Sequence, residues 1–313
     1  MAKAEVRGAY GQALKELGGV NPKVVALEAD VGTSTKSEIF GKAYPDRYFN
    51  FGIAEVNMIS AAAGMASCGL IPFVNTFAVF LMLRGGDPVQ SLIAHDKLNV
   101  KLAGAYTGLS DSYDGSSHQA ITDISQARAM PNLTVLSVCD APQTRQAVFA
   151  MADYNGPVYI RLSRAATDII YDENVKFEIG GSAKLTDGND VSIFATGYMV
   201  QKSLEAAKLL KNDGINARVV DIYSLKPVDT AMIVACARET GCVVTAEEHN
   251  IQGGLGSIIS DELARHCPTP LEMVGMEDVF GESGDYEKLL VKYGMCAENI
   301  AAKAKAAIAR KRK

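Results

Sequence analysis

The sequence predicts an α/β protein of two domains, each built on a mostly parallel sheet flanked by helices. Short apolar runs rich in Val, Ile and Ala alternate with longer segments, which is typical of βαβ units. These runs carry few polar residues, as expected for strands that are buried on both faces. A length of 313 residues suits two ordinary domains, and 48% apolar with 21% charged residues is typical of globular proteins.

The first half of the chain begins with a predicted helix at 3–18, which ends at a pair of glycines, and a buried strand at 24–30. The stretch 48–69 predicts a short strand, a turn at Gly52 and a helix with Glu55 in its first turn. The other strands are expected at 71–77, 100–106, 133–140 and 157–163, and the other helices at 79–96, 122–129 and 142–153.

Regularity lapses at about 165–190, a polar stretch with two glycine-containing turns, so the domain boundary is expected there. We assign the first domain to residues 1–168, a linker to 169–189 and the second domain to 190–313. The second domain repeats the alternation, with strands at 191–197, 217–223, 242–248 and 271–276, and helices at 199–212, 229–240, 285–292, 297–311 and after the run at 253–257.

Composition excludes several classes of protein. A net charge of −5 argues against sequence-independent binding of nucleic acid. The six cysteines form no CxxC pair and lie mostly in apolar segments, which indicates reduced thiols rather than disulfides or a zinc site. The chain shows no apolar core of a signal peptide and no run near the ~18 residues that span a bilayer. We therefore expect a soluble, cytoplasmic protein that binds neither nucleic acid nor membrane.

Polar residues gather in four loops that follow predicted strands of the first domain. In parallel sheets, ligands bind where the strands end. We therefore expect one functional site at this edge of the first domain. The four loops are 30–34, 50–55, 106–118 and 161–164.

Several motifs of the chain resemble motifs of transketolases and occur in the same order. The resemblance covers nearly the whole chain, and 1-deoxyxylulose-5-phosphate synthases share it in looser form. It implies the C-terminal half of a transketolase, in which a pyrimidine-binding domain precedes the transketolase C-terminal domain. The motifs are FGIAEVNM, NTFAVF, YDGSSHQ, IRLSR, VVDIYSLKPVD, EEHNIQGGLGS and GESGDYEKLLVKYG.

Transketolases bind the diphosphate of thiamine diphosphate, and its Mg²⁺, in a separate domain marked by a GDG motif and a later Asn. This sequence has no such motif, since Asp187-Gly188-Asn189 follows Thr186 and fits a turn. The resemblance therefore implies one subunit of a split transketolase, without metal ligands of its own. An N-terminal subunit would supply the diphosphate and metal site in an α2β2 heterotetramer, with helix 56–68 as a candidate contact surface.

Glu55 matches the glutamate that activates the cofactor in this family. A carboxyl group facing N1′ of the aminopyrimidine ring shares a proton with it, so that N4′ can take the proton from C2 of the thiazolium ring. Taken without the motif, Glu55 fits a helix-capping acid better, because carboxylates favour helix N-termini. Phe77 and Phe80 match the aromatic pair around the pyrimidine, or else are core aromatics. Asp30 matches an aspartate near the cofactor.

Asp114 and His118 match the D-G-x-x-H element that faces the donor sugar in transketolases. Asp114 would accept a hydrogen bond from a sugar hydroxyl, while His118 would donate to the substrate and relay protons. A lone histidine in a polar loop is otherwise usually solvated. We expect His95 and His266 to be structural, and His249 to be structural or interfacial.

Arg164 matches the arginine that binds the substrate phosphate in transketolases, and a guanidinium fork suits such an anion. Arg7 and Ser34 fall in register with further contacts to this phosphate. Arg161, two residues before Arg164, fits an anion ligand and a surface charge at a strand end equally well.

The expected reaction transfers a two-carbon ketol unit from a ketose, commonly phosphorylated, to an aldose. Two departures concern the substrate anion: Tyr106 stands where transketolases commonly have a phosphate-binding histidine, and Asp111 adds a negative charge nearby. The alternatives are a β subunit of a 2-oxo-acid dehydrogenase, half of a 1-deoxyxylulose-5-phosphate synthase, and a non-catalytic regulatory subunit. The D-G-x-x-H element and Arg164 argue against a dehydrogenase, because an oxo acid lacks the polyol and the distal phosphate.

Overall fold

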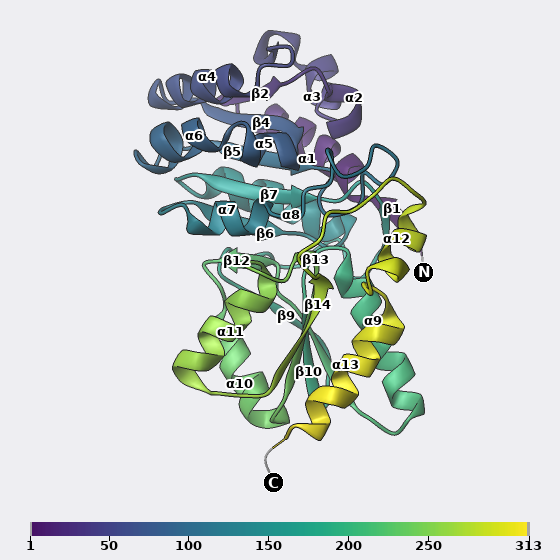
Figure 1. Cartoon of the computed structure of the whole chain (residues 1–313). Coiled ribbons are helices and arrows are strands. Elements are labelled where there is room, and N and C mark those ends of the chain that lie inside the picture. Colours follow the sequence, from purple (N-terminus) through teal and green to yellow (C-terminus); the bar gives the residue numbers. More distant parts are fainter. Residues whose placement is uncertain (1, 312–313) are drawn as a thin grey trace.

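The computed structural model describes residues 2–311, which form two large sheets, one above the other in Figure 1. The first sheet has seven strands in the order β12-β6-β7-β5-β4-β2-β3. All of its strand pairs are parallel except that of β12 with β6. The strands are β2 (Val24–Glu28), β3 (Tyr48–Asn50), β4 (Ile71–Phe77), β5 (Lys101–Ala105), β6 (Thr134–Ser137), β7 (Val158–Leu162) and β12 (Ser224–Lys226).

Helices cover both faces of the first sheet, because successive strand residues point to opposite sides and both sets are apolar. Val24 and Phe73 pack with residues of α1 and α8, whereas Leu27 and Val74 pack with residues of α4, α5 and α7. The helices of this half include α1 (Val6–Val20), α2 (Gly32–Thr35), α3 (Glu38–Ala43), η1 (Pro45–Arg47), α4 (Glu55–Ser67), α5 (Ala78–Leu83), α7 (Asp123–Ala129) and α8 (Ala141–Asp153).

The second sheet has five strands in the order β14-β13-β10-β11-β9, parallel except for β9. Phe194 and Val220 belong to the same buried apolar cluster as Val25 and Leu27, so the cores of the two sheets are continuous. The elements are β9 (Ala183–Thr186), β10 (Val191–Ala195), α9 (Met199–Asn212), β11 (Ala217–Asp221), α10 (Thr230–Thr240), β13 (Val243–Asn250), α11 (Leu255–His266), β14 (Leu271–Met276), α12 (Tyr286–Lys292) and α13 (Ala297–Ala309).

The predicted α/β fold with two mostly parallel, helix-flanked sheets is confirmed, but three local predictions are wrong. The chain begins with strand β1 (Lys3–Glu5), not helix, because it pairs with β8 (Ala166–Asp168). The predicted helix 79–96 breaks after α5, where glycines and a proline interrupt it, into α6 (Gly86–Pro88) and the π-helical η2 (Val89–Ala94). Strands β8 and β9 lie in the stretch expected to be irregular.

The second half of the chain is tied to the first sheet by strand β12 and by two buried side chains of β13. Strand β12 adds an antiparallel edge to β6. A carboxyl oxygen of Glu248 accepts a 2.6 Å hydrogen bond from the backbone N–H of Leu109. Nε2 of His249 accepts one of 3.2 Å from the backbone N–H of Ile124. Residues of β13 therefore hold two segments of the first half in place.

Burial sets the protonation of both side chains. It raises the pKa of Glu248 to about 8 and lowers the pKa of His249 to about 4. At neutral pH, Glu248 therefore carries a proton and His249 is neutral, which matches its role as a hydrogen-bond acceptor. The expectation that His249 is structural or interfacial agrees with this placement.

The proton on Glu248 predicts a pH-dependent stability. The folded chain keeps this proton to a higher pH than the unfolded chain, so its stabilisation is complete below the ordinary pKa of 4.5 and is lost as the pH rises to about 8. The side chain that Glu248→Gln introduces is neutral at every pH. The thermal unfolding midpoint of this variant, relative to that of the wild type, should therefore rise by roughly 2 °C or more between about pH 5 and pH 8.

The measurement is a thermal unfolding series across that pH range. Glu277→Gln changes an exposed glutamate of the same half of the chain and should leave the pH profile unchanged. A difference between Glu248→Gln and wild type that stays constant or shrinks as the pH rises would contradict a protonated Glu248.

Candidate functional site

The carboxyl ends of five parallel strands lie side by side, because β7, β5, β4, β2 and β3 are neighbours in this order. Asp30 follows β2, Phe77 ends β4, Tyr106 follows β5 and Arg164 follows β7. The sequence-predicted loops therefore meet at one edge of the first sheet, as expected for ligand binding in such sheets.

Four aromatic rings from two segments, the junction of β4 with α5 and the loop after β5, form one continuous cluster. The Phe77 ring centroid lies 4.5 Å from that of Tyr106 and 5.9 Å from that of Phe80. The Phe80 ring meets His118 edge to face at 5.1 Å. Phe77 and Tyr106 are buried, while Phe80 and His118 are half-buried. Phe80 and His118 are therefore the accessible rings of the cluster, and Phe77 and Tyr106 are its buried rings.

Tyr106 holds an unusual backbone conformation at the centre of the site. Its φ is +62°, in the left-handed region that bulky side chains rarely adopt. The phenol oxygen accepts a 2.8 Å hydrogen bond from Arg7, and the guanidinium carbons of Arg7 and Arg164 lie 5.4 and 5.1 Å from the ring centroid. The strained residue thus brings two arginines from distant parts of the chain to one ring.

The two arginines form the cationic end of the site. Arg7, in the first turn of α1, also donates a 3.0 Å hydrogen bond to the carbonyl of Ser34. Arg164 donates one of 2.9 Å to Asp111, whose side chain is fully buried. Burial, together with nearby Asp114, raises the pKa of Asp111 to about 6. Asp111, which the sequence marks only as an extra charge, is thus the buried partner of Arg164.

Glu55 forms the opposite, acidic end. It is the first residue of α4 and is 5% exposed, and it accepts a 3.1 Å hydrogen bond from Nη1 of Arg84. The guanidinium of Arg84 lies 4.2 Å from the centroid of the Phe80 ring, so it links Glu55 to the aromatic cluster. A hollow of about 770 Å³ beside this pair is lined by Ala54, Glu55, Val56, Asn57, Ser60 and Arg84.

Sequence analysis did not identify Arg84 as a site residue. Its only sequence signal is its position directly before Gly85-Gly86, where the apolar helix ends. That signal marks a chain turn and says nothing of a carboxylate 29 positions earlier. Only the packing of α5 beside α4 reveals the pair.

Three predicted residues lie at the margin of this group. Asp30 is exposed, has a φ of +63°, and exchanges hydrogen bonds of 3.2 and 3.0 Å with Asn50. Ser34 contributes its carbonyl oxygen, through the bond from Arg7. Asp114 is exposed and is linked to the group through Asp111.

Arg161 is neither a surface charge nor an anion ligand, so both interpretations of its sequence position are wrong. Its side chain is buried and binds Asp123 with two hydrogen bonds, of 2.7 Å from Nε and 3.1 Å from Nη2. A further bond of 3.2 Å reaches the carbonyl of Glu248. Although burial opposes it, the Arg161 charge holds the pKa of Asp123 below its usual value. Arg161 is therefore a structural residue beneath the site.

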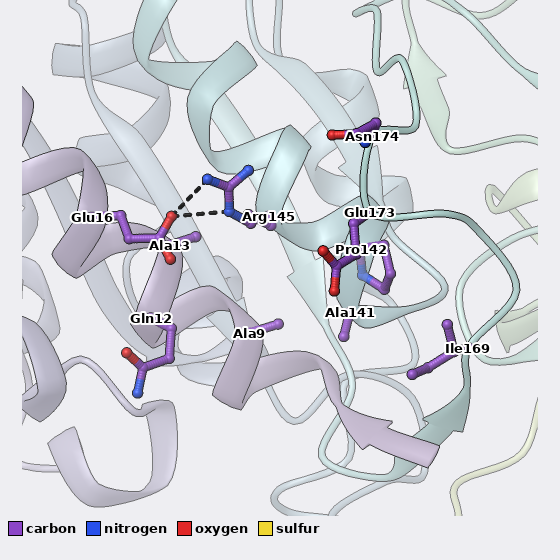
Figure 2. Close-up of a pocket in the computed structure, with 10 residues that line it drawn as sticks. All are labelled: Ala9, Gln12, Ala13, Glu16, Ala141, Pro142, Arg145, Ile169, Glu173 and Asn174. Atoms are coloured by element: carbon purple, nitrogen blue, oxygen red, sulfur yellow. Dashed lines mark hydrogen bonds and ion pairs between the residues drawn. The ribbon is translucent and has the colours of Figure 1, made fainter. Parts of the chain in front are cut away.

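Other features of the described chain lie apart from this edge. Within residues 2–311, no three His, Cys, Asp or Glu side chains come close enough together to hold a metal ion, and no helix is long and apolar enough to cross a membrane. A groove of about 540 Å³ lies beside α1 and the start of α8. Arg145 is paired there with Glu16 (Figure 2). None of the predicted site residues lines this groove.

Comparison with known proteins identifies both halves of the chain. Residues 2–168 match the family "Transketolase, pyrimidine binding domain", and residues 180–300 match "Transketolase, C-terminal domain". A solved structure described as "Split gene transketolase, inactive beta4 tetramer" superposes with a TM-score of 0.92 at 45% identity, covering 99% of this chain and 100% of that one.

Two similar sequences carry descriptive names. The "Putative transketolase C-terminal section" of Methanocaldococcus jannaschii is 40% identical over 299 residues, covering 95% of this chain and 94% of that protein. The "6-deoxy-6-sulfo-D-fructose transketolase subunit SqwH" of a Clostridium species is 39% identical over 295 residues, covering 94% and 92%.

The buried ion pair predicts that Arg161 matters for stability. Arg161→Met leaves the buried Asp123 carboxylate without its charge partner, which should lower the free energy of unfolding by about 3–5 kcal/mol. Arg145→Met breaks a pair with Glu16 whose side chains are both about half exposed, and should cost about 1 kcal/mol or less. Denaturant titration of both variants measures the difference, and equal, small losses would refute the structural role of Arg161.

Proposed function

The chain belongs to the transketolase family, and we propose that it is the C-terminal subunit of a split transketolase that transfers a two-carbon ketol unit from a ketose, commonly phosphorylated, to an aldose. Residues 1–168 then form the pyrimidine-binding domain, 169–189 the linker and 190–313 the C-terminal domain. A partner chain supplies the diphosphate and Mg²⁺ sites, in a cytoplasmic α2β2 heterotetramer.

The observation that supports this function is a continuous row of side chains with an acid at one end and two cations at the other. Glu55 and Phe80 offer a carboxylate and an aromatic face, which suit a planar heteroaromatic ring. Arg7 and Arg164 offer guanidinium groups, which suit an oxyanion. A ring-bearing cofactor that carries a sugar with a terminal oxyanion fits both ends at once.

The acidic end fits the aminopyrimidine half of thiamine diphosphate. The nearly buried Glu55 lies against the hollow of about 770 Å³, where its carboxyl group would face N1′ of the ring. Phe77 and Phe80 would flank the ring, with Asp30 at the margin. When bound, thiamine diphosphate supplies the nucleophilic carbon that carries the two-carbon unit.

The loop after β5 carries the groups proposed to orient the sugar. Ser117 Oγ lies 2.9 Å from Nδ1 of His118, so Nε2 is the ring nitrogen left for the proposed contact with the substrate. From there His118 can donate to the sugar and move a proton, while Asp114 accepts from a hydroxyl. The Tyr106 hydroxyl and the carbonyl of Ser34 both accept hydrogen bonds from Arg7 and so orient it. Arg7 and Arg164 then bind the terminal anion.

The similar proteins support a partner chain and an anionic substrate. The similar split-gene protein is described as an inactive tetramer of β chains, which agrees with the need for a second kind of subunit. The similar Clostridium chain is named as a subunit of a transketolase for 6-deoxy-6-sulfo-D-fructose. Its sulfonate, like a phosphate, is an oxyanion that guanidinium groups bind well.

Glu55→Gln tests the role of the carboxyl group. The amide keeps the size but cannot share a proton with the ring, so kcat for ketol transfer by the co-purified subunits should fall at least about 100-fold. Glu38→Gln, at the first position of helix α3, is the control and should keep wild-type turnover. Near wild-type turnover in Glu55→Gln would sink the assignment. Release of CO₂ from pyruvate would instead indicate half of a 1-deoxyxylulose-5-phosphate synthase. Transfer to a lipoyl domain would indicate a β subunit of a 2-oxo-acid dehydrogenase.

Arg164→Met tests the site for the terminal anion. Losing a charge-assisted hydrogen bond should raise KM for a phosphorylated ketose roughly tenfold or more, with a smaller change in kcat. A ketose without a terminal anion is the matched substrate, and its KM should change much less, because only the loss of the Asp111 partner then acts on it. Equal effects on both substrates would show that Arg164 acts on the fold of the loop rather than on the anion.

A further inference from the structure

We propose that the Arg84 side chain occupies the aminopyrimidine site in the cofactor-free chain and competes with thiamine diphosphate for this site. This inference rests on the proposed function, because it takes Glu55 and Phe80 as partners of the pyrimidine ring. It adds a residue that regulates how readily the cofactor enters, and that neither the motifs nor the family resemblance marks.

The contacts of Arg84 are those that the pyrimidine ring needs. Its Nη1 donates to Oε1 of Glu55 at 3.1 Å, and its Cζ lies 4.2 Å from the centroid of Phe80. A guanidinium is planar, donates hydrogen bonds and stacks on aromatic faces, so it can stand in for a planar nitrogen heterocycle. The same carboxylate oxygen and the same ring face cannot serve both groups at once.

The packing of the neighbouring Gly85 places Arg84 beside α4. A Cβ at Gly85 would overlap the tip of the Ile59 side chain of α4 and the carbonyl of Leu81 in α5, so the chain packs against α4 directly after α5. Arg84 directly precedes this contact and therefore starts beside the first turn of α4, where Glu55 lies.

The side chain of Arg84 is nevertheless able to leave. It is 53% exposed and lines the same hollow as Glu55, whereas the Glu55 side chain is only 6% exposed. The cation can therefore turn outward into solvent while the carboxylate stays in place. The cofactor binds only the fraction of chains in which Arg84 has withdrawn, which weakens its apparent affinity by that fraction.

Calorimetric titration of the co-purified complex with thiamine diphosphate and Mg²⁺ tests this competition. Arg84→Met keeps much of the length of the side chain but removes the charge and the donors, so it should lower Kd about 5- to 30-fold, the combined weight of one exposed ion pair and one cation–π contact. Arg84→Lys keeps the charge without the planar fork and should give an intermediate Kd.

Arg145→Met is a matched control, because Arg145 also pairs with a glutamate and stacks on a phenylalanine. It lies 2.8 Å from Glu16 and 5.1 Å from the Phe149 ring centroid, is 47% exposed, and belongs to the groove in Figure 2. Its Kd should equal that of the wild type. Tighter binding in both variants would indicate a general effect of charge and overturn the assignment of Arg84.

The outcomes separate this inference from the proposed function. If the wild-type complex binds thiamine diphosphate and Arg84→Met binds it equally or more weakly, Arg84 does not compete, and the proposed function still stands. If the wild-type complex does not bind thiamine diphosphate at all, the proposed function and this inference fail together. A purely structural role for Arg84 would weaken binding and lower the unfolding midpoint, the opposite of the expected gain in affinity.

Discussion

The ion pair between Asp123 and Arg161 is the interaction on which the site most depends. It joins the start of α7 to β7, and Arg161 also reaches the carbonyl of Glu248 in β13, so both halves of the chain meet at one buried contact. Removing two charges from water is costly, and the pair is stable only because its bonds are bidentate and Tyr159 donates a further 2.6 Å bond to Asp123. These bonds hold α7, β7 and β13 together beneath the edge of the sheet that carries the site residues.

The conformation of the loop from 107 to 119 depends on this ion pair and on contacts with the second half of the chain. Glu248 accepts from the N–H of Leu109, Gln119 donates to the carbonyl of Glu282 at 3.0 Å, and the carbonyl of Ser112 accepts from Gly284 at 2.9 Å. A loop held at both ends and in the middle can keep Tyr106 in a strained conformation at its start. The second half of the chain therefore positions the proposed sugar-binding groups by holding the backbone that carries them.

The sequence was sufficient for features that follow from strand order, and insufficient for those that depend on contacts between distant residues. Apolar runs identify the strands, and their parallel arrangement places Asp30, Phe77, Tyr106 and Arg164 at one edge. The same pattern could not assign Arg161, because its partner lies 38 positions earlier in a segment whose position only the fold defines. Strand β12 escaped prediction for the same reason, since three residues become a strand only when β6 lies beside them.

The two ends of the site differ in how completely this chain builds them. At the cationic end, Asp111 is fully buried and Arg7 is bonded to both Tyr106 and Ser34, so the guanidinium groups are fixed before any ligand arrives. At the acidic end, Ile53 and Val56, which are close to Glu55 in the sequence, and Leu83, which precedes Arg84, carry apolar side chains that are more than half exposed. Apolar groups gathered in water beside a buried carboxylate favour a surface that another chain covers. The acidic end is also where Arg84 occupies the proposed position of the aminopyrimidine ring. Both features agree with a cofactor site that is completed only when the partner chain binds.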